Sequence, residues 1–221
     1  MINILLEGYN IGANLLYDKL KEYIAPSHRV VVVALSFRDS RVKSLSDWDT
    51  LYSKEKGYIY SGIVDGFHAY GIPEENISFI NYFTDTKESA RQKVEQADIV
   101  YFLGGLPDRM MDRIKEFELQ DVLMKHNGIV MGYSAGAVIQ LAEYHLSPDD
   151  DYPTFGYYKG LPYLDDFYLE VHYEGTVAQT ESIEKVLRER QKPVYALSLM
   201  KGALLVENGN IQLLGDVEKY C

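Results

Sequence analysis

The chain has 221 residues, of which 47% are hydrophobic, 25% charged and 13% aromatic, which is ordinary for a compact globular domain. This composition excludes a disordered chain and a collagen-like repeat, and the single cysteine, Cys221, excludes a disulfide scaffold. With 22 Lys and Arg residues against 33 Asp and Glu residues, the net charge of -11 disfavours nucleic acid and anionic membranes as partners. Residues 1–6 have neither the basic start nor the length of a secretory leader, and no stretch approaches the roughly 18 apolar residues of a membrane helix. We therefore expect one cytoplasmic domain over 1–221.

Short apolar runs alternate with longer amphipathic segments along the first 140 residues, a pattern given by parallel strands that are joined by covering helices. Strands are expected over 2–7, 29–35, 76–81, 98–103 and 128–132. Helices are expected between them over 12–24, 47–70, 86–96 and 108–125. The pattern predicts an α/β fold with a doubly wound, mostly parallel sheet flanked by helices.

The second part of the chain has a different texture. Residues 147–153 form a turn-rich acidic loop, proline and glycine continue to Pro162, and regular structure resumes near Phe167. Beyond it we expect a strand over 167–172, a helix over 180–190, and short strands over 194–199, 202–206 and 210–214 around a turn at Asn208 and Gly209. No linker or repeat divides the chain into further domains.

The residues with the clearest chemical meaning follow the predicted strand 128–132. They read GYSAG over 132–136, a G-x-S-x-G motif between a buried strand and a helix. The two glycines allow a tight turn that raises the Ser134 hydroxyl above the sheet edge, where amides of the helix N-terminus point to the same place. This context favours Ser134 as a nucleophile. The alternatives are an ordinary serine in a strand-to-helix turn and an anion-binding turn.

A serine hydroxyl needs a base to take its proton, and a histidine can fill this role. His172 ends the predicted strand 167–172, and ligand sites in open α/β sheets gather at the carboxyl ends of strands. We therefore expect His172 to be the base. The other histidines read more simply as surface or capping residues, or lie past the nucleophile helix: His28, His68, His126 and His145.

The imidazole in turn needs a carboxylate that holds its tautomer and stabilises its charged form. The acidic loop offers Asp149, Asp150 and Asp151. Glu170 is a fourth candidate, because it lies two residues before His172 on the same strand and so points to the same face, where it could instead orient the substrate. Spacing alone leaves the four carboxylates open.

An oxyanion formed by attack of the serine on a carbonyl needs N–H donors. The amide of Ala135 comes with the turn, and a second donor is expected from Gly105 or Leu106, where two glycines end a neighbouring strand and let its backbone approach. Pro107 cannot donate. The same residues also fit an ordinary strand-to-helix turn with proline near the first helical position, and both interpretations can hold.

Two glycines after one strand, GYSAG after the next and the later pair His172-Tyr173 together resemble the aspartyl dipeptidase (dipeptidase E) and cyanophycinase family of serine peptidases. The resemblance spans most of the chain and implies a flavodoxin-like or class I glutamine amidotransferase-like fold. It implies Ser134 as the nucleophile, His172 as the base and the same amides as the oxyanion hole. It also implies Asp149 as the third triad member, since the dipeptidases carry an aspartate at this interval after the serine.

The sequence departs from the family pattern at the positions that recognise the substrate. The dipeptidases have a GGGN-like turn where this chain has GGLP over 104–107, and arginines where this chain has Ser182 and Lys185. One lysine cannot reproduce a bidentate guanidinium clamp on a carboxylate, so we expect a specificity other than N-terminal aspartate. A tyrosine cluster offers an aromatic wall for a pocket, although such clusters are more often half-buried packing: Tyr152, Tyr157, Tyr158, Tyr163, Tyr168 and Tyr173.

We expect a cytoplasmic serine hydrolase of peptidase type that cleaves the amide of a small peptide through Ser134 and an acyl-enzyme, with no cofactor and no metal. A restricted entrance would favour dipeptides over proteins. Two alternatives stay open: an esterase with the same catalytic residues, and a non-catalytic binding module on the same fold. The expected partner is the small peptide substrate, and a homodimer is compatible with the sequence.

Overall fold

The computed structural model describes residues 1–12 and 14–221. The strands are β1 (Ile2–Leu6), β2 (Val30–Val33), β3 (Ile77–Ile80), β4 (Ile99–Phe102), β5 (Ile129–Tyr133), β6 (Glu143–Leu146), β7 (Gly156–Lys159), β8 (Tyr168–Tyr173), β9 (Val194–Glu207) and β10 (Asn210–Tyr220). The helices are α1 (Asn14–Leu20), α2 (Leu45–Tyr52), α3 (Tyr58–His68), the 3-10 turn η1 (Glu74–Asn76), α4 (Lys87–Glu95), α5 (Pro107–Glu116), α6 (Gln120–Lys125), α7 (Ala135–Val138) and α8 (Val177–Arg190).

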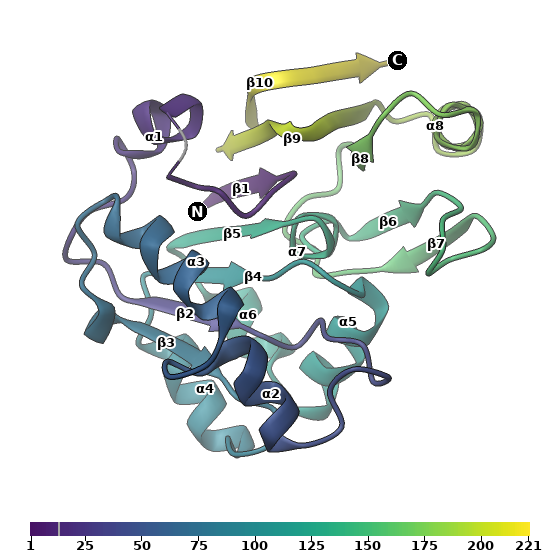
Figure 1. Ribbon diagram of the computed structural model, residues 1–221. Coiled ribbons are helices and arrows are strands. Elements are labelled where there is room, and N and C mark those ends of the chain that lie inside the picture. The colour runs from purple at the N-terminus through teal and green to yellow at the C-terminus, as the bar shows by residue number, and fades with distance from the viewer. Residues whose placement is uncertain (13) are drawn as a thin grey trace.

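The central sheet joins its strands in the order β10-β9-β1-β5-β4-β2-β3, with β8 paired to β9 beside this path (Figure 1). Strands β1, β5, β4, β2 and β3 are mutually parallel. β9 is antiparallel to β1, and β10 is antiparallel to β9. This mixed, mostly parallel sheet confirms the predicted fold class.

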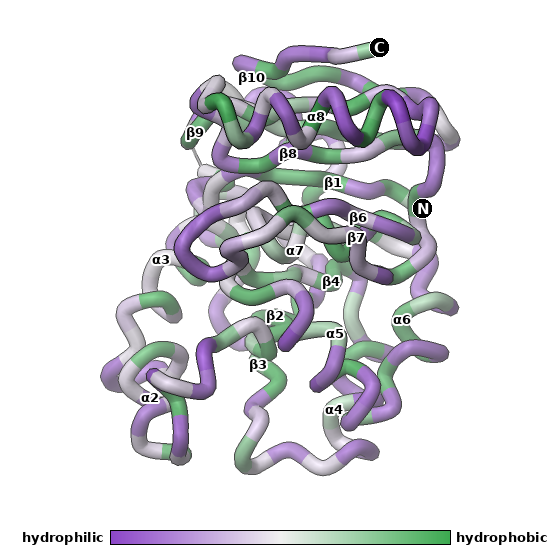
Figure 2. The backbone as a smooth tube through the Cα atoms, turned by 90° about the vertical axis from the view of Figure 1, so that its right-hand side faces the viewer, coloured by the Kyte–Doolittle hydropathy of each residue, from purple (hydrophilic) through white to green (hydrophobic). Residues whose placement is uncertain are grey.

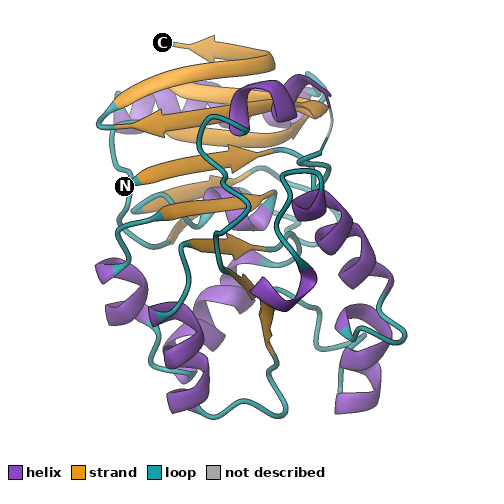
Figure 3. Ribbon diagram, turned by 90° about the vertical axis from the view of Figure 1, so that its left-hand side faces the viewer, coloured by secondary structure: helices purple, strands orange, loops and turns teal. Residues whose placement is uncertain are grey.

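Helices cover both faces of the parallel strands, and each face has its own core (Figure 3). The four valines of β2 show why: Val31 and Val33 pack with α4, α5, α6 and α7, whereas Val30 and Val32 pack with α1, α2 and α3. Side chains alternate between the two faces of a strand, so a strand covered on both sides must be apolar at every position. All four valines are accordingly buried.

Two of the predicted helices are each two helices in the structure. The segment 47–70 contains α2 and α3, which are separated at Gly57, where a Cβ would lie 2.6 Å from the Ser53 carbonyl oxygen. The segment 108–125 contains α5 and α6, which are separated at Glu118, whose φ is 54°. Both members of each pair bury apolar residues in the same core, so the apolar pattern runs on across the breaks. The predicted helix 12–24 corresponds to α1, and residue 13 lies outside the described residues.

The second part of the chain departs furthest from expectation. Part of the predicted loop is the strand β7, which pairs antiparallel with β6, and the ring of Tyr144 stacks on that of Tyr158 at 5.7 Å. The segments 194–199 and 202–206 are one continuous strand, β9, instead of two. The turn between β9 and β10 lies at Asn208 and Gly209 as predicted, with φ of 50° and 78°.

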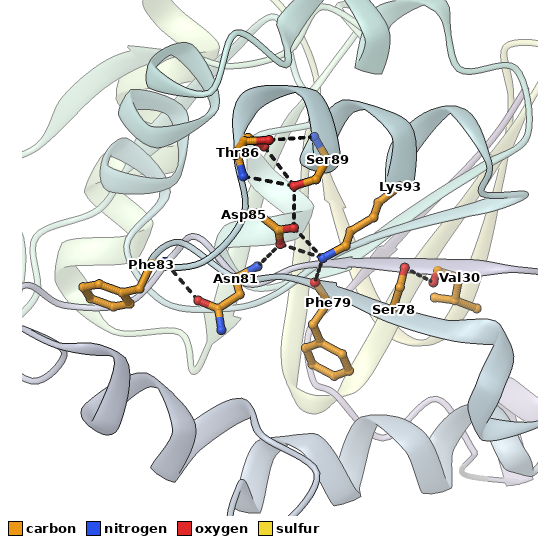
Figure 4. Close-up of polar contacts among 9 residues, drawn as sticks. All are labelled: Val30, Ser78, Phe79, Asn81, Phe83, Asp85, Thr86, Ser89 and Lys93. Carbon is orange, nitrogen blue, oxygen red and sulfur yellow. Dashed lines mark hydrogen bonds and ion pairs between the residues drawn. The ribbon is translucent and has the colours of Figure 1, made fainter.

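The corner between β3 and α4 is fixed by a polar cluster around Asp85 (Figure 4). Its carboxylate accepts hydrogen bonds from Ser89 Oγ and the Asn81 amide, both at 2.7 Å, and pairs with Lys93 Nζ at 2.6 Å. Thr86 and Ser89 add a capping box at the first turn of α4. The helix is thereby held where its apolar side enters the core.

Helix α8 runs beside β8 and β9, with apolar and polar residues alternating along it (Figure 2). Ile183 and Val186 enter a small third core against these strands. Near the start of the helix, the side-chain amide of Gln179 donates to the His172 carbonyl oxygen at 2.8 Å, which holds the end of β8. None of the helices in the described residues is long and apolar enough to cross a membrane.

Candidate active site

Ser134 lies in a strained turn between β5 and α7. Its backbone has φ of 51° and ψ of -115°, and its amide donates to the Leu6 carbonyl oxygen of β1 at 3.0 Å. The two motif glycines are required by close packing: a Cβ on Gly132 would lie 2.5 Å from the Gly136 carbonyl oxygen, and a Cβ on Gly136 would overlap the carbonyl of Phe102 on β4. The serine hydroxyl is therefore displayed on a turn that needs glycine at both positions.

Replacing Gly136 by alanine is expected to lower the free energy of unfolding by about 1–3 kcal/mol, because the added methyl group would overlap backbone atoms of a central strand. Gly62→Ala in α3 is the control, since a Cβ there would lie 3.9 Å from its nearest neighbour, a ring carbon of Tyr9, and alanine favours helix. Urea denaturation measures the free energy of unfolding of both variants and of the wild type. Equal stability of the two would contradict the tight packing of the turn.

His172 reaches Ser134 because β8 approaches this edge of the sheet from the opposite direction. β8 is parallel to the first part of β9, and the last part of β9 is antiparallel to β1, so the carboxyl ends of β8 and β1 meet. A register shift between Glu170 and Tyr173 bends β8 at this point, and His172 has φ of 54°. Its Nε2 lies 2.7 Å from Ser134 Oγ.

The other ring nitrogen contacts Glu7, which directly follows β1. His172 Nδ1 donates to Glu7 Oε1, and the Glu7 amide donates to the Gly202 carbonyl oxygen on β9 at 3.1 Å. The Glu7 residue is only 1% exposed. An ionised carboxylate can only accept, so this contact assigns the proton of the neutral imidazole to Nδ1 and leaves the Nε2 lone pair toward the serine hydroxyl.

Sequence reasoning missed Glu7 and named Asp149 instead. The structure places Asp149 in a turn of its own loop, where its Oδ1 accepts from the amides of Asp151 at 2.9 Å and Tyr152 at 2.7 Å. Asp151 is paired with Arg38. In the structure the carboxylate bonded to the imidazole is that of Glu7, whereas Asp149 is bonded within its own loop. The signal that could have found Glu7 is its position directly after the first buried strand, at the same sheet edge as Ser134.

Glu170 and His145 form a buried pair beside this site. His145 Nε2 lies 2.7 Å from Glu170 Oε2, and Ser147 Oγ donates to the same oxygen at 2.8 Å. Regular alternation predicted a common face for Glu170 and His172, but the bulge intervenes between them and the two side chains bond to different partners. Glu170 thus holds the end of β6 and the start of the loop that follows it.

A cavity of about 270 Å³ adjoins His172. Three carboxylates line it, those of Asp149, Glu170 and Glu174, with no lysine or arginine among the described lining residues. The positions that the resemblance gives to arginines do not supply a free cation: Ser182 donates to the Ala178 carbonyl within its helix, and Lys185 pairs with Glu189 at 2.9 Å. The surroundings of His172 are therefore acidic.

The backbone donors were predicted at three residues. The amide of Leu106 donates to the Ser36 carbonyl oxygen at 2.8 Å and is therefore engaged within the fold. Gly105 is exposed, with φ of 137°, and a Cβ there would overlap the same Ser36 carbonyl. Ala135 begins α7 directly after the serine. Gly105 and Ala135 are the two amides left as candidates for an oxyanion hole.

The tyrosine cluster of the second half is mostly packing. Hydroxyl groups of five of its members make hydrogen bonds within the fold: Tyr152 to Asp108, Tyr157 to Glu189, Tyr163 to the Leu123 carbonyl, Tyr168 to Glu143, and Tyr173 with Tyr220. Burial raises the pKa of the Tyr157 hydroxyl to about 12, and the neighbouring Glu189 adds to this effect.

Within the described part of the chain, no group of three or more His, Cys, Asp or Glu side chains is placed to hold a metal ion.

Comparison with known proteins connects this site to a family. The model of peptidase family S51 matches residues 55–214, more than two thirds of the chain. The structure is similar to the crystal structure of a candidate peptidase E protein from Listeria monocytogenes EGD-e, with a TM-score of 0.68 and 14% identity over 97% of this chain and 98% of that one. It is also similar to a peptidase from an acI-B1 Actinobacterium, with a TM-score of 0.64 and 13% identity over 99% of this chain and 93% of that one.

The curated proteins include none that matches the sequence. The two structural likenesses establish the fold, an α/β sheet flanked by helices like that of peptidase E. The family model extends from the segment between α2 and α3 into β10 and includes both the serine turn and the histidine strand. The chain therefore belongs to peptidase family S51.

Proposed function

We propose that this protein is a serine-type peptidase that hydrolyses amide bonds of small peptides. The observation that carries the proposal is the line of contacts from Ser134 Oγ to His172 Nε2, and from His172 Nδ1 to Glu7, where the carboxyl ends of β5, β8 and β1 meet. A hydroxyl, an imidazole and a carboxylate in this order are the parts of a serine hydrolase, whatever their order along the chain.

The geometry supports a two-stage reaction. Ser134 Oγ attacks the carbonyl carbon of the peptide while His172 Nε2 takes the hydroxyl proton, and the negative oxygen is held by the amides of Ala135 and Gly105. Glu7 stabilises the imidazolium. When the C–N bond breaks, His172 gives this proton to the departing amine and an ester on Ser134 remains. A water molecule, deprotonated by the same imidazole, then releases the acid and restores the hydroxyl.

The size and charge of the cavity beside His172 favour small substrates. A volume of about 270 Å³ accommodates a side chain or a short peptide end. Family membership agrees with amide hydrolysis. The reaction as written needs no cofactor.

The proposal is tested by incubating the purified protein with a panel of dipeptides and tripeptides and with unfolded casein, and measuring released amine. We expect release from some short peptides and little from casein. Release must be lost in the Ser134→Ala variant, because an activity that survives this change comes from another site or from a contaminant. Hydrolysis of simple esters with no amide cleavage anywhere in the panel would replace the peptidase with an esterase.

Dipeptides with N-terminal aspartate are expected to be cleaved at least about tenfold more slowly, by kcat/KM, than the matched asparagine dipeptides. The reason is that a second carboxylate would enter a cavity already lined by Asp149, Glu170 and Glu174, and like charges brought together in a site are costly. Steady-state assays on the two isosteric series measure the ratio. Faster cleavage of the aspartate series would contradict the acidic character of the subsite.

A further inference from the structure

A second cavity, of about 390 Å³, lies on the α3 side of the same sheet edge. Three tyrosine rings from separate segments line it: Tyr9 after β1, Tyr58 at the start of α3 and Tyr133 at the end of β5. Ile59 and Ile63 add apolar surface. Ser61 and Asp65 add polar groups, so the lining is mainly aromatic and apolar and carries one carboxylate, against three in the cavity beside His172.

Two of the three tyrosine rings of this cavity belong to the small set of large hydrophobic side chains that the fold leaves exposed to solvent. Tyr9 is 51% exposed and Tyr58 is 68% exposed, whereas Tyr133 is largely covered. Tyr9 packs edge-on against Tyr133 with ring centres 6.1 Å apart. Exposed aromatic surface gathered around one hollow is typical of a place that receives an apolar group.

Two walls of the cavity are continuous with the catalytic residues. Tyr133 immediately precedes Ser134, and Tyr9 lies two residues after Glu7. The two segments are joined by the hydrogen bond from the Ser134 amide to Leu6. The Tyr133 ring also lies against Gly104, where a Cβ would overlap it, directly before the candidate donor Gly105. A substrate held at the serine is therefore beside this cavity.

The position of Gly62 keeps the cavity open. A glycine inside a helix is unfavourable, yet α3 has one here, facing the cavity. A Cβ would meet only the Tyr9 ring, at 3.9 Å, so the backbone itself does not require glycine. A longer side chain at this position would extend toward Tyr9 into the cavity that Gly62 lines.

We propose that this cavity is a specificity subsite that receives an aromatic or large apolar side chain of the substrate, on a residue next to the bond that is cleaved. The inference rests on the proposed function, because it needs Ser134 to be the nucleophile. It adds the substrate class: peptides with an aromatic or large apolar residue at the scissile bond, oriented by Tyr9, Tyr58 and Tyr133.

The test compares two small serine reagents, phenylmethanesulfonyl fluoride and methanesulfonyl fluoride, which differ only in the phenyl ring. In both, the Ser134 oxygen bonds to sulfur, fluoride leaves and His172 takes the proton. Intact-protein mass spectrometry gives the two labelling rates for the wild type and for Gly62→Leu. We expect the phenyl-to-methyl rate ratio to fall at least about tenfold in Gly62→Leu, because the leucine occupies the cavity.

Gln92→Leu on α4 is the matched control, since it adds a leucine to an exposed helical position on the other face of the sheet and should leave the ratio unchanged. Tyr58→Ala is the second variant, because this exposed ring can be removed without opening the core, and it should lower the ratio in the same direction. If the methyl reagent labels the wild type and neither variant changes the ratio, the subsite is refuted. If neither reagent labels folded wild-type protein, the proposed function itself fails.

Discussion

Glu7→Gln is expected to lower kcat by about four orders of magnitude without unfolding the protein. Glutamine has the same shape, but its amide can donate to His172 Nδ1, which would move the imidazole proton to Nε2 and remove the base from Ser134. Loss of the negative charge at this position also removes the group that stabilises the imidazolium. A change from carboxylate to amide at the acid of a serine triad lowers kcat by about four orders of magnitude. Single-turnover and steady-state assays on the preferred peptide measure the loss, and circular dichroism checks the fold.

Asp149→Asn is the matched control for this change. It also converts one carboxylate near His172 to an amide, but Asp149 Oδ1 is occupied by amides of its own loop, so turnover should change only a few-fold. The family resemblance alone implies the opposite order of effects. A larger loss in Asp149→Asn than in Glu7→Gln would return the role of the acid to Asp149.

Ser134→Ala is expected to reduce kcat by about six orders of magnitude, because no other group can form the acyl intermediate at the end of β5. Its stability should match that of the wild type. The hydroxyl is partly exposed, and alanine meets the same backbone strain at φ of 51° that serine already tolerates. Amine release tests the predicted loss of kcat, and thermal melting of the same preparation tests the predicted stability. Full hydrolysis by this variant would remove Ser134 from the mechanism.

The fold could be predicted from the sequence where the pattern of apolar residues alone distinguishes a buried strand from other elements. Strands such as 29–35 are apolar throughout because both faces are covered, and this leaves an unbroken run that is hard to confuse with a surface segment. The breaks at Gly57 and Glu118 were missed because helices on either side of each break face the same core. The pattern of apolar residues indicates which side of a helix is buried, but it does not indicate where one helix ends and the next begins in a new direction.

The hairpin of β6 and β7 was missed for a different reason. Its strands carry few aliphatic residues, and their contacts come from tyrosine rings, as in the stacking of Tyr144 on Tyr158. Proline and acidic residues between them dominate the local composition and indicate a loop. Cross-strand aromatic pairs of this kind depend on the partner strand, which the local sequence does not identify.

In the candidate site, Ser134 and His172 could be named from sequence because each directly follows or ends a recognisable strand. Glu7 could not be selected by spacing, because it reaches the imidazole through the pairing of β1 with β9 and of β9 with β8. It also lies outside residues 55–214, the part of the chain that matches the family model. The hydrogen bond from the Leu106 amide to Ser36 could not be foreseen either, because Ser36 lies in a loop after β2, far away along the chain.

The most direct measurement is intact-protein mass spectrometry after incubation with a fluorophosphonate, on the wild type and on Ser134→Ala in parallel. An activated serine at the end of β5 predicts a single adduct on the wild type that is absent from the variant, since an ordinary serine hydroxyl does not react with such a probe. An equal adduct on Ser134→Ala, or no adduct on well-folded wild-type protein, would contradict Ser134 as the nucleophile.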